Sequence, residues 1–263
     1  MFGVVPRVIW AKSHPPDDSN RIRLALRPLL IRGHGRTILV DAGIGQKFPQ
    51  RQREMYGVDH GHGDLIASLG AVGVRVEDVT DLVVTHLHFD HVGGATRKEQ
   101  DGRVVPTFPN ALVHVQRVNW EWAVKPNLRE KASYLDENVR PHLESGRLRL
   151  LDGPCDLLPG IRVEVSDGHT RGQQLVIVSS GRRTLFYAGD LIPTSTHLKI
   201  PYTMGYDIEP LRLMEEKQMW LSRAAAEGWI VFFEHDPAMA ACTVQEGPGG
   251  FSVKSPIDLT AAV

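Results

Sequence analysis

The stretch H-L-H-F-D-H-V-G, residues His86–Gly93, is the most informative part of this 263-residue chain. It follows a short apolar, strand-like run and crowds three imidazoles and one carboxylate into a loop. Residues two apart in an extended segment point the same way, so His86 and His88 can share one metal ion, whereas Asp90 and His91, beyond a bend, can face a second. Imidazole nitrogen and carboxylate oxygen are ordinary ligands of zinc and similar divalent ions. The stretch therefore predicts a metal site.

Other apolar runs along the chain also end in residues that can bind a metal. Such runs precede His169, Asp190 and His235, and the run Ile38–Val40 ends in Asp41. We expect these runs to be strands that deliver their last residues to one rim of the fold.

Four motifs together resemble the metallo-β-lactamase-fold hydrolase superfamily. They are T-H-L-H-F-D-H-V-G-G (Thr85–Gly94), G-H-T-R-G (Gly168–Gly172), A-G-D (Ala188–Asp190) and E-H (Glu234–His235). They occur in the family's order, and the resemblance runs from about Ile38 to His235, which is nearly the whole chain. The resemblance implies an α/β fold, a four-layer αββα sandwich of two mixed β-sheets flanked by helices, with a dinuclear metal site on the rim of the sheets.

The resemblance also implies a role for each ligand. The family often reads G-H-T-P-G-H around its third histidine, whereas this chain has Arg171 in place of the proline and Gln173 in place of the last histidine. The histidine that would bind the metal is kept. The first metal would be held by His86, His88 and His169, the second by Asp90, His91 and His235, with Asp190 bridging both.

The implied activity is hydrolysis. Two divalent ions, zinc in our expectation, with manganese, iron or cobalt as alternatives, can share a hydroxide and polarise the bond under attack. We therefore expect a dinuclear metal-dependent hydrolase that attacks an ester-like bond. Asp90 is the expected catalytic residue, because it could exchange a proton with the nucleophile or the leaving group.

The first motif, with Phe89, looks most like the lactonase branch, which includes enzymes that open N-acyl homoserine lactones. Those enzymes usually have a tyrosine three residues after the bridging aspartate, where this chain has Pro193. Residues 191–209, which we call the substrate loop, offer replacement donors that can equally be packing residues. We expect the substrate contacts to come from Phe89, His197 and Tyr206, with Tyr202 as a further candidate.

Other activities of the same fold stay open, namely a mononuclear iron sulfur dioxygenase and a phosphodiester or phosphotriester hydrolase. The dioxygenase uses only the first ligand set, so the second set argues against it. A nuclease of this family is expected to carry extra domains or basic appendages, and the sequence shows neither. A β-lactamase proper would be exported, which the N-terminal residues do not support. A metal-free cluster of hydrogen-bonded histidines explains the recurrence of ligands at strand ends less well.

Bulk properties bear on the number of domains and on partners, and the resemblance implies a small-molecule substrate. Hydrophobic residues make up 42% of the 263 residues, which suits one large domain or two small ones. Because the chain has one obvious constellation of ligands, we expect a single domain over residues 1–263. The formal net charge is −1, so a nucleic-acid partner is not expected. The N-terminal residues lack the pattern of a signal peptide, and no window approaches about 20 apolar residues. We expect a cytoplasmic protein without a membrane partner, with reduced cysteines, and consider a homodimer.

Periodicity and turn residues predict the regular elements. Alternating Ile22, Leu24 and Leu26 predict a half-buried strand, which Gly33–Gly35 turns into the strand Thr37–Asp41. We further expect strands at 110–115, 147–151, 161–165, 174–179 and 184–188, a helix capped by Asp64 that stops near Gly73, a helix around Trp120 and Trp122, and a helix from Pro210 to Gly228.

Overall fold

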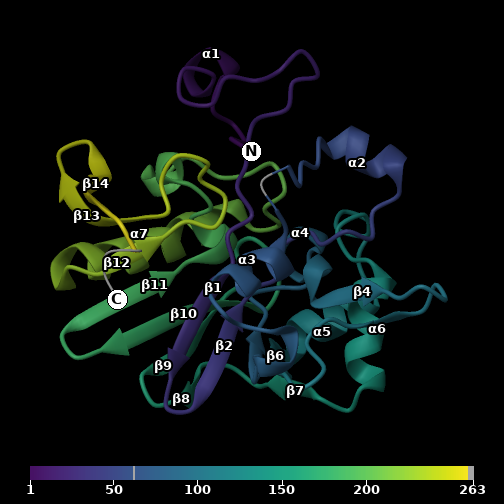
Figure 1. The fold of residues 1–263 in the computed structure, drawn as a ribbon. Helices are drawn as coiled ribbons and strands as arrows, with labels where there is room; N and C mark the ends of the chain where they lie inside the picture. Colours follow the sequence, from purple (N-terminus) through teal and green to yellow (C-terminus); the bar gives the residue numbers. More distant parts are fainter. Residues whose placement is uncertain (62, 260–263) are drawn as a thin grey trace. The chain divides into compact units, whose positions relative to one another are not determined.

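The computed structural model describes residues 1–61 and 63–259, which form mixed α/β structure in two compact units (Figure 1). Pro28–Asp152 forms what we call the five-strand unit. Met1–Arg27 joins the chain from Gly153 onward in the seven-strand unit. The predicted α/β class with two mixed sheets and helices is confirmed, while the single domain stays a prediction.

The five-strand unit is built on a mixed sheet in which only the first pair of strands is antiparallel. Its strands, in spatial order, are β1 (Leu29–Gly33), β2 (Arg36–Val40), β3 (Asp81–Val83), β6 (Leu112–Gln116) and β7 (Leu148–Leu151). A separate hairpin joins β4 (Thr96–Lys98) to β5 (Val104–Pro106). Because β3 lies at the centre of the sheet between parallel neighbours, the loop that follows it leaves from a well-supported position.

The helices of this unit are short. They are α2 (Gln50–Tyr56), α3 (Leu65–Ala71), η1 (Val76–Asp78), α4 (Phe89–Val92), η2 (Gly93–Ala95), α5 (Arg117–Val124) and α6 (Asp136–Glu144). Asp64 caps α3 as predicted, since its side chain accepts a hydrogen bond from the Ala67 amide. Trp120 of α5 is buried in the core with residues such as Leu82 and Val113, whereas Trp122 is only partly buried.

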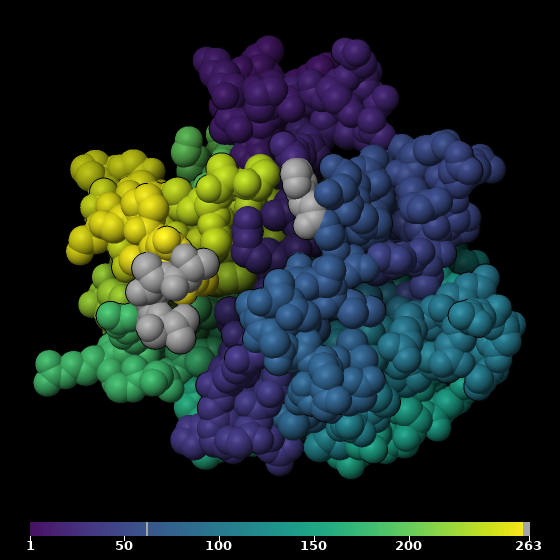
Figure 2. Space-filling model, in the orientation of Figure 1, coloured from purple at the N-terminus to yellow at the C-terminus, as the bar shows by residue number. Residues whose placement is uncertain are grey.

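The seven-strand unit is built on a larger mixed sheet with one parallel pair, β11 with β12. Its strands are β8 (Cys155–Leu158), β9 (Ile161–Ser166), β10 (Gln173–Ser180), β11 (Arg183–Tyr187), β12 (Ile230–Phe232), β13 (Ala241–Gly247) and β14 (Gly250–Ile257). The β13–β14 hairpin ends the described chain, and Figure 2 shows it in yellow at the surface. The helical turns of this unit are α1 (Arg7–Trp10), η3 (Gly189–Leu191) and η4 (Ser195–Leu198).

The long helix α7 (Pro210–Glu227) covers the sheet of the seven-strand unit (Figure 1). Proline occupies its first turn, and Gly228 ends it in the left-handed conformation with φ 69°, both as predicted. Its buried residues follow a helical period, which places them on one face. They are Leu213, Lys217, Trp220, Leu221 and Ala224.

The strand predicted around Ile22–Leu26 is wrong, because residues 21–28 form no strand and the first strand is β1. Instead, this segment bonds to the segment after β12 through a backbone amide and a side chain. The Ala25 amide donates to the His235 carbonyl, and the Arg27 guanidinium donates to the carbonyls of Phe233 and Asp236. The alternating pattern predicted that this segment pairs with another strand, and it does not.

None of the helices in the described part of the chain is both long and apolar enough to cross a membrane. Cys155 and Cys242 are both free thiols, as expected.

Candidate metal centre

Three histidines gather in the loop and short helix that follow β3. His86, His88 and His91 are all buried, and the His86 ring centroid lies 4.5 Å from that of His88 and 3.9 Å from that of His91. The Asn119 side chain accepts a 2.9 Å hydrogen bond from the Leu87 amide, which fixes the backbone between the first two. The five-strand unit therefore brings together three of the predicted ligands.

Asp90 completes this group at a more open position. It lies in α4, its side chain is 28% exposed, and its Oδ2 is 3.9 Å from Nε2 of His91. An accessible carboxylate beside buried imidazoles suits a residue that both binds a metal and exchanges a proton.

Asp41, at the end of β2, contacts His91. Its side chain is fully buried, and its Oδ2 lies 3.1 Å from Nδ1 of His91. It also accepts hydrogen bonds of 2.7 Å from both the amide and the hydroxyl of Thr85. Metal-binding histidines commonly donate their second ring N–H to a carboxylate, which fixes the ring orientation. Asp41 fits that role and leaves Nε2 of His91 facing Asp90.

Glu130 takes the corresponding place beside His88. Its side chain is buried, and its Oε1 lies 3.4 Å from Nε2 of His88. The other oxygen, Oε2, accepts hydrogen bonds from Trp122 and Asn127. With Nε2 turned to Glu130, Nδ1 of His88 is the nitrogen left for a metal.

The segment that carries Asp90 and His91 is locked against the loop after β2. Methyl groups on Gly93 or Gly94 would overlap the carbonyl oxygens of Ile44 and Ala42. The Lys47 ammonium donates to the carbonyls of Gly93 and Thr96, and burial lowers the pKa of Lys47 to about 8. Glycine at these positions permits the backbone contact that holds α4 in place.

The seven-strand unit brings together the other three predicted ligands around one carboxylate. Asp190 Oδ2 lies 3.2 Å from Nε2 of His169, and Oδ1 lies 3.0 Å from Nε2 of His235. Each oxygen thus faces a different imidazole nitrogen. All three side chains are buried, and the role of Asp190 as a bridge between two metal ions stays a prediction.

Both of these histidines are oriented through their second nitrogen. Nδ1 of His169 lies 2.8 Å from Oδ1 of Asp207, and Nδ1 of His235 lies 2.9 Å from the Ala25 carbonyl. The loop that carries His169 is further fixed because the His169 carbonyl accepts a hydrogen bond from the Ile208 amide at 3.2 Å. Nε2, which faces Asp190 in both rings, is the nitrogen that would bind a metal ion.

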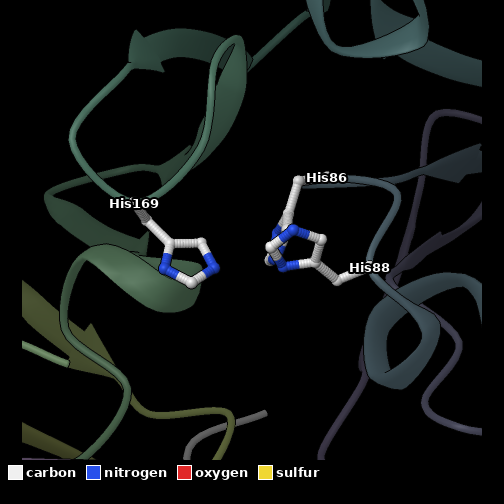
Figure 3. A group of neighbouring side chains, drawn as sticks. All are labelled: His86, His88 and His169. Carbon is white, nitrogen blue, oxygen red and sulfur yellow. The ribbon is translucent and has the colours of Figure 1, made fainter. Parts of the chain in front are cut away.

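The chemistry of these donors fits divalent metal ions. Each unit presents buried imidazole nitrogens beside a carboxylate, a set that zinc, manganese, iron and cobalt all accept. Figure 3 shows the imidazoles of His86 and His88 on the loop after β3, and that of His169 on the loop after β9. The predicted ligand roles nevertheless remain predictions.

The expected substrate residues differ in accessibility. Phe89 packs against the rings of Phe48 and Tyr56, with centroids 5.3 and 5.1 Å away. Tyr206 is 60% exposed on the substrate loop, whereas Tyr202 packs edge-on against Phe2. Tyr206 is therefore the better placed of the two tyrosines to meet a substrate.

The structure argues against the expectation that His197 contacts a substrate. The ring is 1% exposed and stacks on Phe2, with centroids 5.0 Å apart. Nδ1 lies 2.7 Å from the Thr194 hydroxyl, and Nε2 lies 2.9 Å from the Met1 carbonyl. Burial also lowers the pKa of His197 to about 3. His197 is a packing residue, the alternative that the sequence left open.

Sequence patterns had missed the orienting groups Glu130 and Asp207 and suggested only the position of Asp41. Glu130 and Asp207 are separated by 42 and 38 residues from the histidines they face. Asp207 lies near the end of the substrate loop, three residues before α7, and this position was the one available signal.

A comparison with known sequences supports the motif assignment. The sequence model described as the Metallo-beta-lactamase superfamily matches residues 28–235. An N-acyl homoserine lactonase of Bacillus cereus is 28% identical over 175 residues, which cover 65% of this chain and 62% of the relative. The chain thus spans less than two thirds of the length of the curated relatives it matches.

Two solved structures share the fold. A protein of Staphylococcus aureus, described as a probable metal-dependent hydrolase, has a TM-score of 0.88 at 30% identity, covering 98% of this chain and 90% of that one. A dizinc quorum-quenching lactonase with bound product has a TM-score of 0.71 at 23% identity, covering 90% and 81%, which shows the fold alone. The match over residues 28–235, together with the 30% identical structure, establishes that the chain belongs to the metallo-β-lactamase superfamily.

Proposed function

We propose that this protein is a metal-dependent hydrolase with a dinuclear centre that opens a lactone ring. The observation that carries the proposal is the Asp190 carboxylate, whose two oxygens each face a different histidine at 3.2 and 3.0 Å. Membership of the superfamily supports joining this group with the histidines after β3 into one set of seven ligands: His86, His88, Asp90, His91, His169, Asp190 and His235.

When bound, two divalent ions, zinc in our proposal, would supply an activated water and polarise the bond under attack. The chain's own residues would do the rest. Asp90, with an accessible side chain, would take a proton from the nucleophile and return it to the leaving oxygen. Asp41, Glu130 and Asp207 would hold the imidazoles in their metal-binding orientation.

The lactone is proposed as the substrate class because N-acyl homoserine lactonases are among the relatives that this chain resembles. Phe89, with its aromatic neighbours, would provide an apolar surface beside Asp90. The Tyr206 hydroxyl would donate a hydrogen bond to the lactone carbonyl in place of the tyrosine that Pro193 replaces. We thus propose a small molecule of the cytoplasm as the partner, rather than nucleic acid or a membrane. A homodimer is a separate proposal, which light scattering would test.

The first experiment measures metal content per chain and hydrolysis in one preparation. Protein purified without chelator is assayed against a panel of lactones, a phosphodiester and a phosphotriester. About two metal ions per chain with lactone turnover are expected. A single iron without hydrolysis would sink the proposal and favour the sulfur dioxygenase, whereas turnover confined to the phosphoesters would overturn the lactone assignment.

Two variants test the named residues. Asp190→Ala should lose metal and activity together, whereas Asp156→Ala, at an exposed ion pair in the same unit, should change neither. Full metal content and normal turnover in Asp190→Ala would remove the bridging role. Tyr206→Phe should lower lactone turnover with metal content unchanged, and an unchanged rate would remove Tyr206 from the site.

A further inference from the structure

The substrate loop is fixed from within the seven-strand unit by the side chain of Lys217. This lysine lies on α7 and is 0% exposed. Its Nζ donates hydrogen bonds to the carbonyl oxygens of Lys199 and Tyr202, at 2.8 Å each, and of Ile200, at 3.3 Å. As an ammonium group Lys217 has three donors for the three acceptors on this turn, and as a neutral amine it has two.

Core packing alone does not account for a lysine at this position. Burying an ammonium group costs free energy unless it is well paired, and methionine or leucine would fill a similar volume without that cost. Among the described residues, the partners of Lys217 are backbone carbonyls rather than a carboxylate, and Asp207 acts on it only at longer range. Lys217 therefore contributes the hydrogen bonds that keep the turn Lys199–Tyr202 in place.

That turn leads directly to the proposed substrate contact. The Tyr202 amide closes it by donating to the Lys199 carbonyl at 3.0 Å. Four residues further on stands Tyr206, and the next residue, Asp207, accepts from the Met204 amide at 2.6 Å. A shift of the turn would therefore move the exposed Tyr206.

We propose that Lys217 is a positioning residue of the substrate loop, which anchors the turn Lys199–Tyr202 and thereby sets the place of Tyr206. The proposal rests on the proposed function, because it assumes that the loop receives the substrate. Lys217 touches no reacting atom. Without the anchor the loop would have to be ordered each time a substrate binds, so the effect should fall on KM rather than on kcat.

The test compares Lys217→Met with Lys254→Met, which removes an exposed lysine on β14 of the same unit. In Lys217→Met, trypsin should cut after Lys199 about tenfold faster, and KM for the lactone should rise about tenfold with kcat nearly unchanged. Lys217→Arg keeps the charged donors, so its cleavage rate after Lys199 and its KM should lie between those of Lys217→Met and the unaltered protein. Lys254→Met should behave as the unaltered protein.

Several outcomes would overturn the proposal. One is an unchanged cleavage rate after Lys199 in folded Lys217→Met. Another is equal acceleration at distant sites such as Arg97, which would indicate general destabilisation. If Lys217→Met does not fold, Lys217→Gln serves, and unaltered hydrogen exchange at the Tyr202 amide would count against the anchor. Absence of lactone turnover in the unaltered protein, with faster cleavage after Lys199 in the variant, would refute the function and retain the anchor.

Discussion

Gly93 packs directly on Ile44, so closely that a methyl group on Gly93 would overlap the Ile44 carbonyl oxygen. This contact lies two residues after His91, in the turn η2 that ends α4. The packing of two backbones, rather than of side chains, fixes the segment that carries two proposed ligands.

Gly93→Ala should therefore destabilise the protein by about 2–3 kcal/mol, because the backbones must separate. For a chain of this size the unfolding midpoint should fall by about 5–10 °C. Gly70→Ala is the matched control, since Gly70 lies in α3 with nothing within 4 Å of the added methyl group. It should be neutral or stabilising by up to about 1 kcal/mol. Equal midpoints for both variants would contradict the backbone contact.

Asp207→Ala should weaken metal binding about 10- to 100-fold, because His169 would lose the carboxylate that orients it. Competition with a chromogenic chelator measures the affinity. Asp207→Asn keeps an oxygen that can accept from Nδ1, so its loss should be smaller. The orienting role is disproved if Asp207→Ala binds metal as tightly as the unaltered protein.

Glu130→Gln should destabilise the metal-free protein by about 1–3 kcal/mol, although it preserves the shape of the side chain. Trp122 and Asn127 donate to one oxygen, while the other faces His88 and the Tyr134 hydroxyl. An amide would turn its NH2 group toward donors on one side or the other. Urea unfolding measures the effect, with Glu121→Gln, at an exposed position of α5, as control. Equal unfolding free energies would argue against the network.

Lys217 should make stability depend on pH. Burial lowers the pKa of Lys217 from 10.5 to about 7, opposed by the Asp207 carboxylate. Between these values the unfolded chain binds a proton that the folded chain does not, so the unfolding free energy should rise with pH from about 7 to about 10. Below pH 7 the full cost of the buried charge remains. Of its other neighbours, His197 stays neutral over this range because burial lowers its pKa to about 3.

Urea titrations of the unaltered protein and Lys217→Met across this range test the prediction. The difference in unfolding free energy between the two proteins should shift in favour of the unaltered protein as the pH rises. A difference independent of pH would show that Lys217 does not lose its proton in the folded state.

Local patterns predicted much of the fold. The helix from Pro210 to Gly228 follows from residues at its own ends, and Asp64 caps its own helix. His86, His169 and Asp190 each follow a strand, namely β3, β9 and β11, and the order of strand and loop can be predicted from the chain itself.

What the sequence did not predict depends on residues far apart in the chain. The role of Asp207 requires a neighbour 38 residues away, and the burial of His197 depends on Phe2 and Met1. The segment around Ile22–Leu26 alternates as a strand would, but its hydrogen bonds go to residues near His235. No local rule identifies such partners.

The imidazole of His169 contacts the residue just before the substrate loop and a residue near the end of the loop, with Asp190 at 3.2 Å from one nitrogen and Asp207 at 2.8 Å from the other. The His169 ring therefore joins the two ends of a segment of 18 residues, 190–207, as a cross-link would. Replacing His169 would separate these two ends as well as remove a ligand, so such a variant would confound metal loss with loop release. Insertions or deletions between Asp190 and Asp207 should be tolerated better than replacement of His169, because the entropy of closing a loop grows only slowly with its length.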